Sequence, residues 1–306
     1  MTLTLNQCRN FSPYPTAAVF FVLLLLAGGF IENVQAQGES GKQVLGVCAD
    51  PYMLPFSNRE QEGFENRIAE LFAEKLGAEL KYKFFPQRRG FIRNTLRVQK
   101  TDGSYACDLV ITVPESFELA ATTRPYYTTT YMLVYARERG IPEVETPAEF
   151  AELVRDRDKS EFKMGLSDMG MAQQMWVLRN DIMDQIVPYQ GMPGDPKHNP
   201  GELLMKDIAA GKIDAAIVFG PTAGYYARQL SDQADFVLLK MRDDPENPRM
   251  RFEISLAMAV RYGEDEWKQK VNELIEENRD EIYAILEEYG VPILPLKIAP
   301  KSDDDD

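Results

Sequence analysis

Residues 107–114 read CDLVITVP and residues 212–221 read KIDAAIVFGP, and the two stretches follow one pattern. In each, an aspartate, Asp108 or Asp214, comes before an unbroken apolar run that ends near a proline. Unbroken apolar runs of this length are typical of strands that are buried on both faces of a parallel sheet. The repeated stretch therefore predicts two α/β units in one chain.

Strands and helices alternate before each buried run. The segments expected before the first run are a strand at 44–48, an amphipathic helix at 64–77, a strand at 80–85 and a short helix at 89–99. Those expected before the second run are a strand at 163–167, a helix at 171–183, a strand at 186–189 and a helix at 201–211. Such alternation implies parallel sheets with helices on both faces. We therefore expect an α/β fold with two lobes.

Two further segments are expected to cross between the lobes. Residues 124–140 are rich in β-branched and aromatic side chains, which suits an extended segment, and residues 252–260 provide the return. Lobe I is then discontinuous, with residues 43–130 and 254–300, and lobe II comprises residues 131–253.

A hinge made of two crossings places a cleft between the lobes. Ligands of open α/β sheets bind outside the carboxyl ends of the strands, so we expect the cleft to face those ends. The hinge residues expected from the two crossings are Tyr126, Tyr127, Tyr131 and Phe252.

Composition and charge argue against several classes of function. The sequence has 34 Lys and Arg against 48 Asp and Glu, a net charge of −14, which disfavours general binding to nucleic acid or anionic lipid. His198 is the one histidine, and no CxxC, CxxCH or GxxxxGK[ST] motif occurs, so no metal, haem or P-loop site is expected. We expect no cofactor. Residues 301–306 are expected to be a solvated acidic tail.

The N-terminal sequence predicts export. Residues 17–31 form one apolar block, which is too short for a comfortable membrane span of about 20 residues, and a polar sequence follows it. Val34, Gln35 and Ala36 form a small-x-small triplet of the kind that signal peptidase accepts, so residues 1–36 are expected to be a signal peptide. The alternative is an uncleaved anchor. Cleavage would leave the remaining chain in the periplasm and off the membrane.

Two cysteines remain after cleavage, because Cys8 leaves with the signal peptide. Cys48 and Cys107 would lie in an oxidising compartment, which permits a disulfide. The expected fold places Cys48 near the end of one parallel strand and Cys107 at the start of its neighbour. That offset exceeds the Cα separation of about 7 Å that a disulfide can bridge, so the sequence leaves the pairing open.

Several motifs carry a resemblance to known proteins. Residues 47–58 (VCADPYMLPFSN), 63–77 (GFENRIAELFAEKLG) and 107–113 (CDLVITV) resemble the type II periplasmic solute-binding proteins that serve amino-acid ABC transporters. Within that superfamily, residues 86–96 (PQRRGFIRNTL) and 117–134 (FELAATTRPYYTTTYMLV) look like the MxaJ and XoxJ proteins, which are encoded with quinone-dependent methanol dehydrogenases.

The resemblance breaks at the positions that would bind an amino acid. Such receptors need an arginine for the carboxylate, a hydroxyl beside it and an acid for the ammonium group. The arginine aligns with Phe117, the hydroxyl with Pro114 and the acid with Gly220, and one aromatic wall becomes Arg89. Among these aligned positions, Asp50 alone has the residue type that the amino-acid receptors have there. We therefore expect that amino acids do not bind.

The resemblance implies an accessory protein of a PQQ-dependent methanol or alcohol dehydrogenase, which binds that enzyme to assist its activation or maturation. The alternative is an ABC-transporter receptor for a small, anionic solute. An enzyme is not expected, because beyond Asp50 and Asp168 the sequence shows no carboxylate pair and no activated nucleophile.

A basic stripe is one candidate for binding. Arg89, Arg93 and Arg97 repeat at every fourth position of a predicted helix, and Arg88 precedes them at the end of a strand. An anionic ligand or an acidic partner surface would suit these side chains, which we expect at the cleft. The alternative is a solvated helix face.

Two other groups of candidates lie in predicted loops. The backbone amides of Ser167, Asp168 and Met169 connect a strand to a helix and could hold an anion, although an ordinary helix N-cap is the alternative. Tyr52 and Met53 follow the first strand and are expected at the cleft.

Overall fold

The computed structural model describes residues 43–158, 160–167 and 170–296. The expected signal peptide, Asp168, Met169 and the acidic tail lie outside these residues. The described residues belong to one compact unit. Among their helices, none combines the length and the apolar character that crossing a membrane requires.

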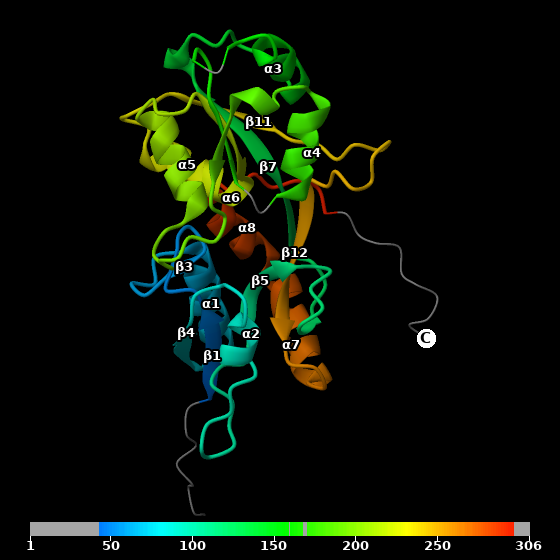
Figure 1. The fold of residues 1–306 in the computed structure, drawn as a ribbon. Coiled ribbons are helices and arrows are strands. Elements are labelled where there is room, and N and C mark those ends of the chain that lie inside the picture. Colours follow the sequence, from blue (N-terminus) through cyan, green and yellow to red (C-terminus); the bar gives the residue numbers. More distant parts are fainter. Residues whose placement is uncertain (1–42, 159, 168–169, 297–306) are drawn as a thin grey trace, which may run out of the picture. The chain divides into compact units, whose positions relative to one another are not determined.

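Two strands, β7 (Tyr127–Ala136) and β12 (Glu253–Val260), connect two groups of elements (Figure 1). We call the group before β7 and after β12 lobe I, and the group between them lobe II. Lobe I contains β1 (Val44–Ala49), β2 (Tyr52–Met53), β3 (Ser57–Asn58), α1 (Phe64–Leu76), β4 (Glu79–Phe84), α2 (Phe91–Asn94), β5 (Val110–Pro114), β6 (Ala121–Thr122), α7 (Asp265–Glu277) and α8 (Arg279–Glu288). Lobe II contains α3 (Pro147–Val154), β8 (Met164–Ser167), α4 (Met171–Arg179), β9 (Ile186–Tyr189), α5 (Pro200–Ala209), β10 (Ala215–Phe219), α6 (Gly220–Gln229) and β11 (Phe236–Lys240).

Strand β7 changes its pairing partner partway along its length. From Tyr127 to Thr130 it pairs antiparallel with β12. From Tyr131 to Tyr135 it pairs antiparallel with β10, and its other edge pairs with β11. The change falls between Thr130 and Tyr131, the position at which the sequence predicts a lobe boundary.

The main sheet is mixed rather than parallel. Its strands follow the order β5-β12-β7-β10-β8-β9, with β6 beside β12 and β11 beside β7. Strands β10, β8 and β9 run parallel, as do β1 and β4. The crossing strands run antiparallel to the strands beside them. The expectation of parallel sheets is therefore corrected, because each crossing strand inserts into a sheet in the opposite direction.

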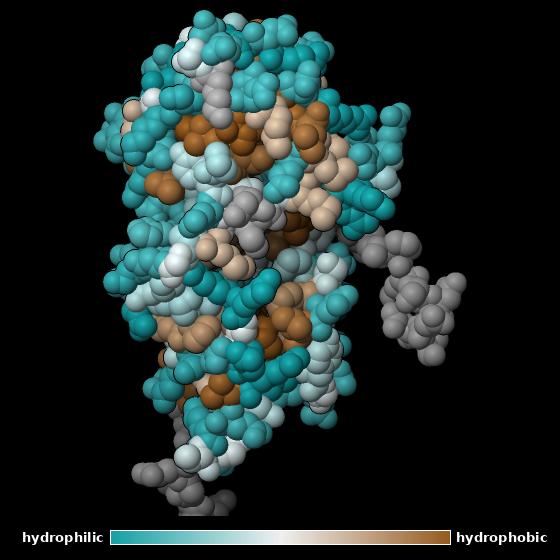
Figure 2. All heavy atoms as spheres, in the orientation of Figure 1, coloured by the Kyte–Doolittle hydropathy of each residue, from teal (hydrophilic) through white to brown (hydrophobic). Residues whose placement is uncertain are grey.

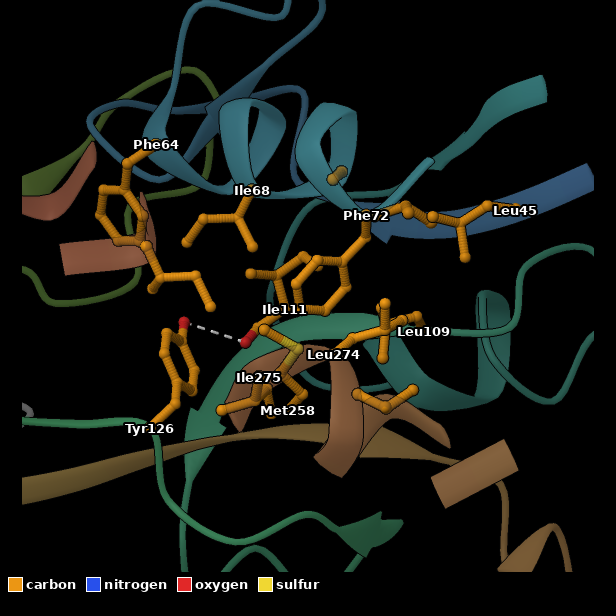
Figure 3. Close-up of a cluster of buried hydrophobic side chains, with 14 of the residues drawn as sticks. Leu45, Phe64, Ile68, Phe72, Leu109, Ile111, Tyr126, Met258, Leu274 and Ile275 are labelled. Atoms are coloured by element: carbon orange, nitrogen blue, oxygen red, sulfur yellow. Dashed lines mark hydrogen bonds between the residues drawn. The ribbon is translucent and has the colours of Figure 1, made fainter. Parts of the chain in front are cut away.

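The core of lobe I packs α1, α7 and α8 around buried strand residues. Phe64, Ile68 and Phe72 repeat along the buried face of α1 and are fully covered. Figure 3 shows Ile68 and Phe72 directed toward Ile111 and Leu109 of the buried run, and Phe64 belongs to the same cluster. The Tyr126 hydroxyl reaches into the same core and donates a hydrogen bond of 3.1 Å to the Ile111 carbonyl. Tyr126 therefore joins the start of the crossing to the lobe I core.

Lobe II has helices on both faces of its sheet, as expected. Alternate residues of β7 point to opposite faces: Leu133 and Tyr135 contact the α3 and α4 side, whereas Met132 and Val134 contact the α5 and α6 side. A strand that is covered on both faces is apolar at every position, which explains the continuous runs in the sequence.

The segment that carries the basic stripe departs from the expected helix. Helix α2 ends at Asn94, and residues 95–97 form turns. The Arg97 side chain turns away to donate a hydrogen bond of 2.6 Å to the Leu119 carbonyl. The expected alignment of Arg89, Arg93 and Arg97 on one helix face is therefore wrong, because only one helical turn forms.

A disulfide joins Cys48 to Cys107, with the two Cα atoms 5.4 Å apart. The offset argued from regular strands does not apply, because β5 begins only at Val110 and the preceding residues bend toward β1. The N–H groups of both Asp108 and Leu109 donate to the carbonyl of Gly46. A Cβ atom at Gly46 would lie 2.9 Å from the Cys107 Cα, so glycine permits this approach. The geometric argument against the disulfide was therefore wrong.

Candidate functional site

The cleft between the lobes contains two adjoining chambers. Chamber I, of about 270 Å³, lies against lobe I, and chamber II, of about 220 Å³, lies against lobe II. Met53, Phe56, Tyr131 and Phe219 line both chambers. Figure 2 shows apolar atoms in the recess between the lobes, with hydrophilic side chains around it.

Aromatic rings from both lobes meet at the wall between the chambers. Phe56 of lobe I and Phe219 of lobe II are stacked, with ring centroids 6.2 Å apart and planes 3° from parallel. Tyr131, on the crossing strand β7, contacts the same Phe219 ring, and the centroids of these two rings are 5.1 Å apart. The cleft thus has an aromatic centre to which both lobes and the hinge contribute.

The polar groups around the chambers are neutral. Chamber I includes the Gln87 and Thr112 side chains, and chamber II includes the polar side chains of Ser167, Gln173, Asn199 and Thr222. Among the described residues, no charged side chain lines either chamber. A charged ligand would lose its hydration in these chambers without gaining an ionic partner from that part of the chain. The lining therefore favours an apolar group with a few hydrogen-bonding atoms.

Asp50 lies at the end of β1, where it organises the lobe I loops. Its carboxylate accepts hydrogen bonds from the backbone N–H groups of Tyr52, at 2.7 Å, and Gln87. The Ser57 hydroxyl binds the Asp50 backbone at both its N–H and its carbonyl. Burial raises the pKa of Asp50, although its backbone donors and the positive charge of Arg88 act in the opposite direction. Asp50 therefore holds two loops together and does not line either chamber.

Glu65 is a second buried carboxyl group beneath chamber I, and no pattern in the sequence singles it out. It lies in the first turn of α1, is 5% exposed, and has the hydroxyl groups of Thr112 and Ser57 beside its carboxyl group. Burial raises the pKa of Glu65 to about 8, and the negative charge of Asp50 adds to this effect.

The hydrogen-bond directions around Glu65 agree with a protonated carboxyl group. The Tyr126 hydroxyl gives its hydrogen to Ile111, so Thr112, 3.0 Å away, must donate to Tyr126. The Ser57 hydroxyl gives its hydrogen to the Asp50 carbonyl. Neither hydroxyl keeps a hydrogen for an ionised Glu65, whereas a protonated Glu65 can donate to Thr112.

Arg88 and Arg89 have different surroundings. Arg88 is half-buried and donates to backbone carbonyls of the lobe II segment 193–195. Arg89, in contrast to Arg88, is exposed to solvent. Tyr52, also half-buried, has Arg59 of its own lobe and Lys197 of lobe II near its ring.

The residues aligned with the amino-acid site do not form one site. Pro114 is exposed and lines chamber I, whereas Phe117 packs against the small core around the Cys48–Cys107 disulfide. Gly220 is buried, and a Cβ atom there would overlap the Thr130 carbonyl oxygen and the Pro292 ring. No side chain at Gly220 could reach the cleft. The structure thus separates these positions, and Pro114 is the one that remains at the cleft.

The other candidates are divided between the cleft and the cores. Met53 and Ser167 line the chambers, and Asp168 and Met169, which follow Ser167, lie outside the described residues. Of the four hinge candidates, Tyr131 alone lines the chambers. Tyr126 and Tyr127 belong to the lobe I core, and Phe252 belongs to the lobe II core.

Sequence reasoning missed the residues that define the chamber walls. Phe219 is the last residue of the buried run in KIDAAIVFGP, and its position before Gly220 and Pro221 could have indicated a side chain at the carboxyl end of a strand. Phe56 lies in the motif that carries the family resemblance. Gln173 and Asn199 give no comparable signal, because their positions depend on how α4 and α5 begin.

Comparison with known proteins agrees with the fold. The model of a family described as "Bacterial extracellular solute-binding proteins, family 3" matches residues 44–292. The sequence is 23% identical over 297 residues to "Protein MoxJ" of Methylorubrum extorquens, which covers 92% of this chain and 94% of that protein.

Two solved structures are also similar. The periplasmic binding protein XoxJ from Methylobacterium extorquens aligns with a TM-score of 0.64 and 28% identity, covering 82% of this chain and 100% of XoxJ. MxaJ from Methlophaga aminisulfidivorans aligns with a TM-score of 0.62 and 22% identity, with the same coverage. The second likeness concerns the fold alone.

Proposed function

This chain belongs to the bacterial extracellular solute-binding proteins, family 3, and from this premise we propose that it is a periplasmic, non-enzymatic accessory protein of a PQQ-dependent methanol or alcohol dehydrogenase. Its similarity to MoxJ and XoxJ supports this placement. The chain would use its cleft to bind a segment of the dehydrogenase and so assist the activation or maturation of that enzyme.

The neutral, aromatic lining of the two chambers is the observation that carries the proposal. Phe56, Tyr131 and Phe219 offer apolar surface, and the surrounding hydroxyl and amide groups can bind peptide N–H and carbonyl groups. An exposed apolar side chain of a partner segment fits this chemistry, whereas the zwitterion of an amino acid does not. Aromatic side chains in such a pocket are also typical centres of protein interfaces.

A transporter receptor for a small, anionic solute is the alternative, and the structure favours it less. An anion needs a positive side chain or a row of free N–H groups. Arg88 is the basic side chain of lobe I that binds the lobe II segment 193–195, and its guanidinium group is already bound to carbonyls there. No catalytic pair is proposed either, because Asp50 and Glu65 are both buried beneath the chamber wall.

Photo-crosslinking in the host periplasm tests the proposal. A benzophenone amino acid replaces Pro114, which is exposed at chamber I, and in a matched control it replaces Thr101, which is exposed elsewhere on lobe I. We expect the dehydrogenase to be captured from position 114 and not from position 101. Capture of no protein from position 114, together with a small solute that co-purifies with the unmodified chain, would favour the receptor.

A further inference from the structure

The loop between β9 and α5, residues 190–199, reaches from lobe II to lobe I (Figure 1). It is rich in proline and glycine, with the sequence QGMPGDPKHN. Three separate sets of interactions join it to lobe I. We call this loop the strap.

The first contact is made by Arg88 of lobe I. Its guanidinium group donates to the carbonyls of Pro193, at 2.6 Å, and Asp195, at 2.9 Å, with Gly194 further away at 3.4 Å. These are charge-assisted hydrogen bonds, which are stronger than neutral ones. Asp50 fixes the position of Arg88, because it binds the N–H group of the preceding residue, Gln87.

The second contact is made by Asn199, at the end of the strap. Its side-chain oxygen accepts from the N–H groups of Gly201 and Glu202 and so caps helix α5. Its side-chain NH2 group donates to the Leu54 carbonyl of lobe I at 2.9 Å. One buried side chain thus ties the start of a lobe II helix to a lobe I loop.

The third contact places the Lys197 ammonium group 5.8 Å from the centre of the Tyr52 ring of lobe I. Tyr52 precedes Met53, which lines both chambers, and Asn199 itself lines chamber II. The strap is therefore continuous with the chamber walls.

From these contacts we propose that the strap latches the two lobes across the mouth of the cleft, and that access to the chambers requires its release. The hinge strands connect the lobes covalently, so the closed arrangement depends on contacts that can be exchanged for water. At the strap those contacts are side-chain hydrogen bonds from Arg88 and Asn199, and they can break without loss of any strand pairing. The proposal does not depend on which molecule enters the cleft.

Two substitutions remove the latch by different routes. Arg88→Ala removes the guanidinium donors. Asn199→Asp keeps an oxygen that caps α5, because aspartate and asparagine are equivalent caps, but it removes the donor to Leu54. Arg89→Ala is the matched control, since Arg89 has the same charge and an adjacent position but is exposed.

Electron-spin distance measurements report the lobe arrangement. Nitroxide labels are attached through ketone-bearing amino acids at Glu60 of lobe I and Lys206 of α5, both exposed, which leaves the cysteines untouched. We expect one narrow distance distribution in the protein and in Arg89→Ala. In Arg88→Ala and in Asn199→Asp the ratio of closed to open molecules should fall by about tenfold or more, which appears as a shift to longer distances.

Distributions that are unchanged in both latch variants would overturn the proposal. An equal shift in Arg89→Ala would also overturn it, because positive charge rather than the observed hydrogen bonds would then hold the lobes. If Arg88→Ala fails to fold, Asn199→Asp decides the matter alone, since it leaves the Arg88 contacts and the residues of the lobe I loops unchanged.

Discussion

The buried carboxyl group of Glu65 predicts an unusual pH dependence of stability. Burial raises the pKa of Glu65 from an ordinary value of 4.5 to about 8 in the folded protein. Between these two values the folded state holds the proton and the unfolded state has released it. A rise in pH across this range therefore favours unfolding, by about 1.4 kcal/mol per pH unit. Below pH 4.5 both states hold the proton, and above about pH 8 both release it, so the effect is confined to that window.

Replacement of Glu65 by Gln removes this titration and keeps a side chain that can donate to Thr112. At pH 5 the variant and the parent protein should be similar in stability. As pH rises, the free energy of unfolding of the variant should exceed that of the parent protein by a growing amount. By pH 7 this difference should be about 3 kcal/mol. Denaturant unfolding at half-unit steps from pH 4.5 to 8.5 measures it, with Glu70→Gln, an exposed position on the same helix, as the control. Stability curves of parent and Glu65→Gln that run parallel would refute the reasoning.

Three further predictions concern the cleft, the lobe contact and the disulfide. Calorimetry with the twenty amino acids should give no binding, because Phe117 and Gly220 provide neither of the required charges; micromolar binding of any of them would show that the site is misplaced. Gly220→Ala should lower the free energy of unfolding by about 2–3 kcal/mol, since its Cβ would overlap Thr130 and Pro292, whereas Gly194→Ala, which has open space, should not. Joint replacement of Cys48 and Cys107 by Ala should cost about 4 kcal/mol in stability for a loop of 59 residues, and an unchanged unfolding midpoint would contradict a constraining disulfide.

The sequence was sufficient to predict the lobes because their signals are local. The run at 186–189 was expected to be a strand and is one, and the apolar face of 64–77 forms the helix that covers the lobe I core. Strand direction was harder, because residues 127–136 show β propensity but not which strands they join.

The site depends on contacts that are distant in sequence. Arg88 binds carbonyls more than one hundred positions away, and nothing near it in the sequence indicates them. Glu65 in a first helical turn suggests an exposed charge that complements the helix dipole, and only the packing of Thr112 and Ser57 shows that it is buried. The approach of Cys107 to Gly46 likewise depends on a bend outside any regular strand.

The central proposal is that this chain serves a dehydrogenase through its aromatic cleft. The most direct measurement deletes the gene from its host and restores it as the parent sequence, as Phe219→Ser in the chamber wall, or as Tyr262→Ser on the exposed surface of lobe I. Quinone-dependent dehydrogenase activity and solute uptake are then followed in the same cells. We predict that activity falls on deletion and is restored by the parent and by Tyr262→Ser but not by Phe219→Ser, with uptake unchanged. Full dehydrogenase activity in the deletion strain, together with the loss of uptake of one solute, would contradict the proposal.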